Sequence, residues 1–167
     1  INMYAILDLL NKETNHNHIL MTDAGSGSYI CPVALNLKAD QRLISSPSQA
    51  DMGWALPASI GVAIESRQCV IPIVGDGSFM TNIQELATVS YHDLNIKFII
   101  LNNNGYLSIK NTQSKYFNGR VYGAECESGF RIPDLKGVSS SFGINYQRIE
   151  KLSDGHLITE HLSHNKP

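Results

Sequence analysis

Two short polar motifs follow apolar runs of this chain, and together they could hold a metal ion and a diphosphate. Asp76 stands in a Gly-Asp-Gly-Ser turn after the run 70–74, and Asn103 follows the run 97–101. If both runs are parallel strands, their carboxyl ends meet at the edge where open α/β sheets bind ligands. The interval between the motifs is long enough for a strand, a crossover helix and a second strand.

The donor types favour Mg²⁺, a hard cation that takes oxygen ligands from carboxylates, carbonyls, water and phosphates. Asp76 would supply the charge, Asn103 a side-chain oxygen, and Gly105 a main-chain carbonyl. The amides of Gly77 and Ser78 would face a phosphate where a helix is expected to begin, and the Ser78 hydroxyl could add a bond. Gly-Asp-Gly alone is a common turn, so the prediction depends on the second motif.

The surrounding pattern predicts alternating strands and helices. Strands are expected at 19–21, 42–45, 70–74, 97–101 and 145–149, and helices at 3–12, 52–65, 82–91, 107–115, 134–142 and 153–164. A Gly/Ser turn is expected after Asp23, and a long loop at 118–133 beside the ligand edge. Because the strand runs are continuously apolar, the pattern favours an α/β fold, a doubly wound parallel sheet with helices on both faces.

Composition limits the class of protein. With 167 residues, 43% hydrophobic, the chain fits one domain spanning 1–167. A net charge of −2 offers no basic surface for nucleic acid. No apolar run approaches the roughly 20 residues of a membrane helix, so a cytoplasmic location is expected. Cys31, Cys69 and Cys126 lack the spacing of zinc ligands or of a disulfide framework and are expected to be reduced.

Both chain ends also carry an expectation. The chain begins at Ile1 and stops after a predicted helix, where the alternating pattern calls for one more strand. We therefore expect a piece of a longer protein that lacks a final strand.

Several motifs carry a family resemblance. The turn Gly75-Asp76-Gly77, followed one strand later by Asn102-Asn103, resembles the cofactor motif of thiamine-diphosphate enzymes. Residues 52–61, residues 78–88, and Ile132-Pro133-Asp134-Leu135 followed by Phe142-Gly143 resemble the acetohydroxyacid (acetolactate) synthase family. The resemblance covers nearly the whole chain and implies a pyrophosphate-binding, C-terminal domain.

The resemblance implies thiamine diphosphate and Mg²⁺ as cofactors, with Asp76, Asn103 and the Gly105 carbonyl as metal ligands. The residues that it places around the cofactor are Ser26, Gly27, Ala50, Met52, Gly75, Asp76, Gly77, Ser78, Asn103, Gly105, Tyr106, Leu107 and Ile109.

Four of these residues have particular implied roles. Ser26 and Gly27 stand where the resembled synthases have Gln-His, so only their backbone roles transfer. Met52 matches the apolar residue that holds the two cofactor rings in a V shape. Ala50 aligns with a glycine whose carbonyl accepts a hydrogen bond from the 4′-amino group of the pyrimidine.

The implied function is the cofactor-binding domain of a 2-keto acid decarboxylase or carboligase. The activating Glu of the family lies in a pyrimidine-binding domain, of the same protein or another subunit, so this chain is expected to hold no catalytic residue and to be inactive alone. The complete protein is expected to be a homo-oligomer. Ile109 stands where the resembled pyruvate decarboxylases carry an acid, which favours carboligation because an apolar group donates no proton.

Two alternatives remain open at this point. One is the small subunit of a two-chain decarboxylase that resembles sulfopyruvate decarboxylase. The other is a degenerate, non-catalytic binding module. The acceptor substrate and a flavin elsewhere in the protein lie beyond what the chain predicts.

Overall fold

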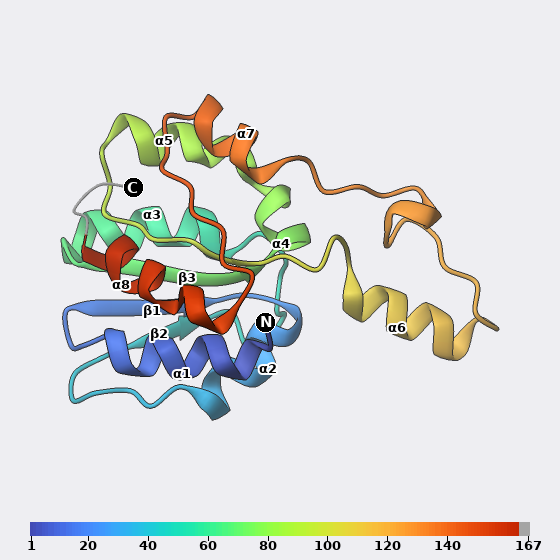
Figure 1. Ribbon diagram of the computed structural model, residues 1–167, viewed down its shortest axis with the longest axis horizontal. Coiled ribbons are helices and arrows are strands. Elements are labelled where there is room, and N and C mark those ends of the chain that lie inside the picture. Colours follow the sequence, from blue (N-terminus) through green and yellow to red (C-terminus); the bar gives the residue numbers. More distant parts are fainter. Residues whose placement is uncertain (164–167) are drawn as a thin grey trace.

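Four parallel strands form the centre of the computed structural model, which describes residues 1–163 (Figure 1). They are His18–Thr22 (β1), Leu43–Ser45 (β2), Cys69–Gly75 (β3) and Ile99–Leu101 (β4), in the order β2-β1-β3-β4. The longest pairing joins β1 to β3, from His18 opposite Cys69 to Thr22 opposite Ile73. The doubly wound parallel α/β fold that the sequence predicts is thereby confirmed.

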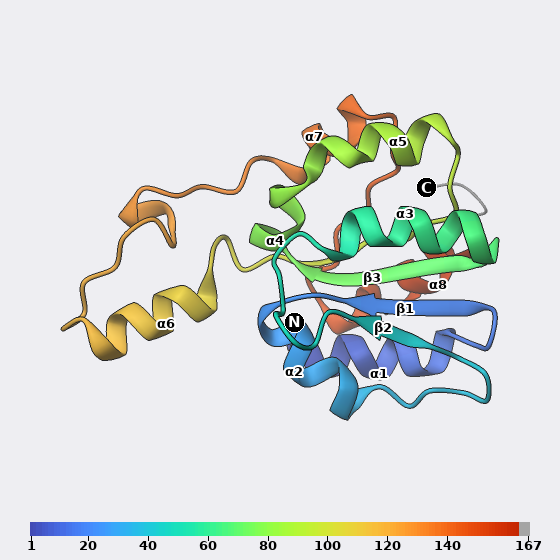
Figure 2. The same cartoon turned by 180° about the vertical axis from the view of Figure 1, so that it is seen from behind.

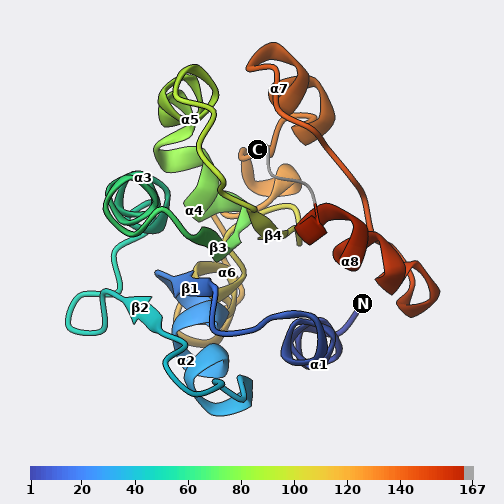
Figure 3. The same cartoon turned by 90° about the vertical axis from the view of Figure 1, so that its left-hand side faces the viewer.

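Helices cover both faces of this sheet (Figure 3). They are Met3–Glu13 (α1), Gly25–Ala34 (α2), Ala55–Ser66 (α3), Asp76–Thr81 (α4), Leu86–Tyr91 (α5), Leu107–Tyr116 (α6), Leu135–Ser141 (α7) and His156–Ser163 (α8). Short 3-10 turns span Ile83–Glu85 (η1), Cys126–Ser128 (η2) and Leu152–Gly155 (η3). One face packs on α1, α2 and α8, and the other on α3, α4, α5 and α7.

Alternate strand residues supply the two halves of the core. Leu20 and Ile71 point to the α1 side, whereas Met21 and Val70 point to the α3 side, and all four are at most 1% exposed. This division follows from the two-residue period of a strand. Burial on both faces explains why the strand runs are continuously apolar.

Three differences from the predicted elements concern helices near the site. Residues 25–34 form α2, although their Gly-Ser-Gly-Ser start reads as a turn, because Cys31 is fully buried against the sheet and packing outweighs weak propensity. The helix predicted from residue 52 begins at Ala55 instead. After β3, α4 starts at once with Asp76, and η1 separates it from α5.

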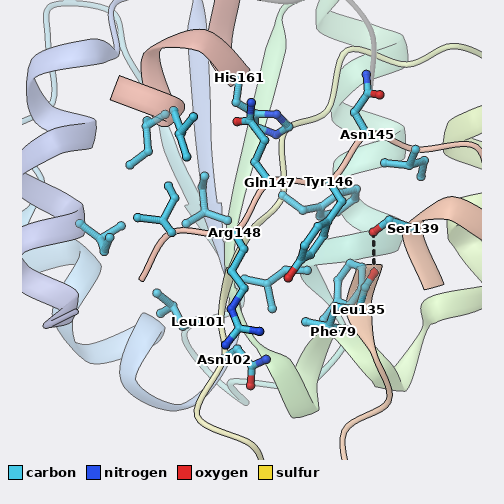
Figure 4. A pocket seen from close by; sticks show the side chains of 18 of the residues that line it. Phe79, Leu101, Asn102, Leu135, Ser139, Asn145, Tyr146, Gln147, Arg148 and His161 are labelled. Atoms are coloured by element: carbon cyan, nitrogen blue, oxygen red, sulfur yellow. Dashed lines mark hydrogen bonds between the residues drawn. The ribbon is translucent and has the colours of Figure 1, made fainter. Parts of the chain in front are cut away.

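The predicted strand 145–149 is wrong, since this segment has no strand structure. A cavity of about 490 Å³ lies between it and β4, lined by Leu101 and Asn102 on one side and by Gln147 and Arg148 on the other (Figure 4). A strand needs hydrogen-bonded pairing as well as propensity, and residues 145–149 pair with none of the four strands. The last predicted helix corresponds to η3 and α8, and its final residue, His164, lies outside the described residues.

Residues 107–131, here called the arm, project from the carboxyl end of the sheet (Figures 1 and 2). The arm contains α6, in which no residue is buried, and η2 within the loop predicted at 118–133. In the described part of the chain, no helix combines the length and apolar character needed to cross a membrane.

Candidate functional site

The two polar motifs meet at Asp76. This residue opens α4 directly after β3 and is only 1% exposed. Its Oδ2 accepts hydrogen bonds from the amides of Asn103 and Gly105, at 3.0 and 3.1 Å. Its Oδ1 accepts one from the amide of Gly77 at 2.7 Å. We call Gly75, Asp76, Gly77 and residues 103–105 the corner; a single buried carboxylate holds its two loops together.

The oxygen donors of the corner fit a hard cation. A carboxylate offers about four lone-pair positions, and the three amides leave one for a metal. The Asn103 side chain is exposed at the same loop, and Gly105 contributes a carbonyl. In residues 1–163 no three His, Cys, Asp or Glu side chains cluster for a metal, so a cation would depend on amide and carbonyl oxygens beside Asp76.

Burial controls the charge of the corner. It raises the pKa of Asp76 above its ordinary value, because the ionised form loses hydration. The surrounding amides oppose this effect, since each donates to the carboxylate. The ionised form thus depends on the backbone geometry of both loops.

Two glycines of the corner have no room for a side chain. A Cβ at Gly77 would lie 2.2 Å from the Tyr106 ring, which stacks on Phe130 with centroids 4.3 Å apart. A Cβ at Gly105 would lie 2.2 Å from the carbonyl oxygen of Ala124, which accepts a hydrogen bond from the Tyr106 amide. The contact at Gly105 is with backbone, so this position requires glycine, whereas a side chain at Gly77 would have to displace the Tyr106 ring.

The Ser78 hydroxyl is bonded to two neighbouring residues. It donates to Asp23 Oδ2 at 2.6 Å and accepts from the Gly53 amide at 2.8 Å. In this arrangement the single proton of the hydroxyl is used by Asp23, so the predicted bond to a phosphate would require the hydroxyl to rotate. Asp23, 1% exposed, was missed in the sequence; its only signal is a carboxylate directly after a strand.

The remaining expected residues lie at the same edge of the sheet in different environments. Met52 is 43% exposed in the loop before α3, and Ala50 in that loop has a positive φ of 52°. Ser26 is exposed on the first turn of α2. Gly27, by contrast, is buried, and a Cβ there would lie 2.4 Å from Thr22 Oγ1, so it serves close helix packing against the sheet.

The arm begins beside these residues. Leu107 and Ile109 are exposed in the first turns of α6. A Cβ at Gly25 would lie 3.8 Å from Ser108 Oγ, which places the start of α2 next to the start of α6. The structure therefore gathers the Asp76 corner, the Met52 loop and the start of the arm at one end of the sheet.

Comparisons with known proteins identify relatives of this amino-acid sequence. A family model described as "Thiamine pyrophosphate enzyme, C-terminal TPP binding domain" matches residues 23–166. The acetolactate synthase large subunit of Buchnera aphidicola subsp. Acyrthosiphon pisum (strain APS) is 30% identical over 169 residues, covering 92% of this chain and 29% of that protein.

Two further relatives have similar names. Acetolactate synthase isozyme 1 large subunit of Escherichia coli (strain K12) is 32% identical over 122 residues, covering 72% of this chain and 22% of the relative. Chloroplastic acetolactate synthase of Arabidopsis thaliana is 28% identical over 156 residues, covering 90% and 23%. The chain spans less than a third of the length of these curated relatives.

Proposed function

Since this chain belongs to the thiamine pyrophosphate enzymes, through their C-terminal cofactor-binding domain, we propose that it anchors thiamine diphosphate through Mg²⁺ at the Asp76 corner. It would do so in a 2-keto acid decarboxylase or carboligase of the acetolactate synthase type. When bound, the cofactor supplies the carbon nucleophile and electron sink that such chemistry needs.

The observation that carries this proposal is the buried Asp76 carboxylate between two loops. Asp76, the Asn103 side chain and the Gly105 carbonyl would hold the metal, and the amides of Gly77 and Ser78 would face the diphosphate. The chain itself thus provides one negative charge and several fixed dipoles for a cation and its phosphates. Nothing in this role requires a catalytic side chain from these residues.

The Met52 loop supports a second part of the proposal. Met52 exposes an apolar surface at the same sheet edge as the corner. We assign it to support the two rings of the cofactor, with the Ala50 carbonyl as an acceptor for the pyrimidine amino group. A large, adaptable thioether suits such packing.

The exposure of the arm supports the proposal that another domain completes the active site. A helix of ten residues with no buried side chain is marginal by itself in water. Tyr116, Phe117 and Tyr122 expose 68%, 58% and 75% of their surface on the arm. We propose that a pyrimidine-binding domain with its activating Glu, from the same protein or another subunit of a homo-oligomer, covers this surface in the cytoplasm.

Asp76→Ala tests the anchor. In the protein expressed from its full gene, we expect the variant to lose Mg²⁺-dependent binding of thiamine diphosphate in calorimetry. Asp8→Ala is the matched control, because Asp8 is an exposed carboxylate on α1. Binding by Asp76→Ala within twofold of the unmodified protein would refute the assigned metal ligand.

The product of turnover tests the reaction type. We expect the full protein, with both cofactors, to join two 2-keto acid units after decarboxylation, because Ile109 offers no proton to release an aldehyde. Ile109→Glu should raise the aldehyde fraction among the products. Failure of a panel of 2-keto acids to react would contradict the acetolactate synthase type and favour a non-catalytic module.

A further inference from the structure

The loop that carries Met52 is attached to α4 through Gly53, the residue after Met52. The Gly53 amide donates to Ser78 Oγ at 2.8 Å, and the Gly53 carbonyl accepts from Asn82 Nδ2 at 2.8 Å. With a φ of 82°, Gly53 is so close to α4 that a Cβ would lie 2.7 Å from Thr81 Cβ. The amide and the carbonyl of Gly53 are therefore bonded to α4 and to Asn82, the residue that caps it.

Asp23 completes this attachment from a third element. Its Oδ2 accepts from the Ser78 hydroxyl at 2.6 Å and from the Ala55 amide at 3.3 Å, and its Oδ1 accepts from the Ala24 amide at 2.6 Å. Since the Ser78 hydroxyl has one proton, donating it to Asp23 turns the oxygen lone pairs toward Gly53. Asp23 thus sets the direction of the Ser78 hydroxyl and also bonds the first turn of α3.

The junction links two parts of the proposed cofactor site. Ser78 lies two positions after the metal-binding carboxylate on α4, and Gly53 lies one position after Met52. A displacement of the loop relative to α4 would change the separation between the diphosphate anchor and the ring support. A buried, charge-assisted hydrogen bond resists such displacement more strongly than a neutral one.

We propose that Asp23 is a positioning residue of the cofactor site, which acts through Ser78 and Gly53 to fix the Met52 loop relative to the Asp76 corner. This inference rests on the proposed function. Asp23 touches neither the metal nor the diphosphate in this role. Loss of Asp23 should weaken the binding of a ligand that contacts both the corner and the Met52 loop. It should not weaken the binding of a ligand that contacts the corner alone.

Two probes separate these effects in the protein expressed from its full gene. Thiamine diphosphate spans the corner and the Met52 loop, whereas inorganic pyrophosphate occupies only the corner, each with Mg²⁺. For Asp23→Asn we expect the dissociation constant of thiamine diphosphate to rise about tenfold or more, as for loss of a hydrogen bond to a charged group. The constant for pyrophosphate should stay within about twofold, a difference too small to mark a lost hydrogen bond.

Asn82→Ala provides a second variant that removes the other bond to Gly53 and leaves the buried carboxylate in place. Its matched control is Asn11→Ala, because Asn11 Nδ2 likewise donates to a distant backbone carbonyl, that of Ala34, at 2.9 Å. Amide hydrogen exchange without any ligand should accelerate in residues 46–54 for Asn82→Ala and Asp23→Asn. The Asn11→Ala control should leave exchange there unchanged.

Specific outcomes overturn the inference. Equal weakening of both probes in Asp23→Asn and Asn82→Ala would indicate general destabilisation, and unchanged exchange in residues 46–54 would show that the loop is held by other contacts. Either result refutes the positioning role while the unmodified protein still binds both probes. If the unmodified protein binds neither probe, the proposed function itself fails, and the positioning role with it.

Discussion

The corner and the arm leave the same edge of the sheet but are stabilised in opposite ways. At the corner, the Asp76 carboxylate is 1% exposed and accepts hydrogen bonds from three backbone amides. Gly77 and Gly105 lie so close to other groups that an added Cβ would clash with them. In the arm, α6 buries no residue. The corner is stabilised by contacts within this chain, whereas much of the arm is exposed.

Polar contacts join α6 to the segment of the arm that follows it. Gln113 exchanges two hydrogen bonds with the backbone of Tyr122, and Lys110 pairs with Glu125. Such partly exposed bonds define a shape and add little stability. The difference agrees with the proposal that the corner anchors the cofactor and that the arm contacts a partner.

The largest expected effect comes from filling the corner. Gly105→Ala places a Cβ 2.2 Å from a backbone oxygen, which cannot rotate away, so the free energy of unfolding should fall by about 3 kcal/mol or more. Urea unfolding measures this loss, and Mg²⁺-dependent cofactor binding should disappear with it.

Gly61→Ala is the matched control for that substitution. Nothing lies within 4 Å of a Cβ at Gly61 in α3, so alanine should stabilise the helix by about 0.5–1 kcal/mol. Equal stability of the two variants would contradict the close packing of the corner.

The reactivity of the cysteines should differ between the arm and the rest of the protein. Burial raises the pKa of Cys31 and of Cys69 to about 11, from an ordinary value of 9.0, whereas Cys126 is exposed in the arm. At pH 7 a pKa of about 11 leaves on the order of one thiolate in ten thousand. A maleimide should therefore modify Cys126 first, and mass spectrometry of timed samples would identify the site.

The same shifts predict the pH dependence of stability. Because the folded pKa values are raised, the folded state holds these thiol protons more tightly than the unfolded state. Their contribution is complete below about pH 9 and is lost as the pH rises toward about 11. The free energy of unfolding should fall over that interval, and Cys31→Ala should reduce the slope; an unchanged slope would argue against a buried Cys31 thiol.

The elements that the sequence predicts correctly have a local signal. The apolar runs at 70–74 and 97–101 gave correct strand positions, although β4 is shorter, and the two motifs after them do meet at Asp76. α2 was missed because its glycines and serines resemble a turn, while its helical state depends on contacts with the sheet.

Contacts between distant residues explain the other failures. The role of Asp23 depends on Ser78 and Ala55, which no local pattern connects to it. Residues 145–149 have a strand-like composition, but strand structure requires a partner at hydrogen-bonding distance. Pairing across the sheet and between loops is a tertiary property, and a single sequence carries no direct signal of it.

Limited proteolysis of the folded protein should cut the arm before the rest of the chain. Lys115 is exposed at the end of α6 and Arg120 is exposed in the loop after it, and exposed segments with few buried contacts are cut first. Trypsin should therefore cleave this chain at these two residues before it cleaves at Lys97, which is fully buried just before β4. Cleavage should slow when a partner domain covers the arm, and early cleavage at the buried Lys97 would contradict the comparison.

The smallest expected effect concerns the ion pair of the arm. Lys110 and Glu125 retain 42% and 27% of their side-chain exposure, so solvent screens their attraction and Lys110→Ala should change the global free energy of unfolding by less than about 1 kcal/mol. The local effect should be larger, because the pair joins α6 to the segment before η2, and tryptic cleavage at Lys115 should accelerate. Lys12→Ala is the control, since Lys12 pairs with Asp8 on the surface of α1. A large global loss in Lys110→Ala would mean that the arm unfolds together with the corner, because the two would then share one cooperative unit.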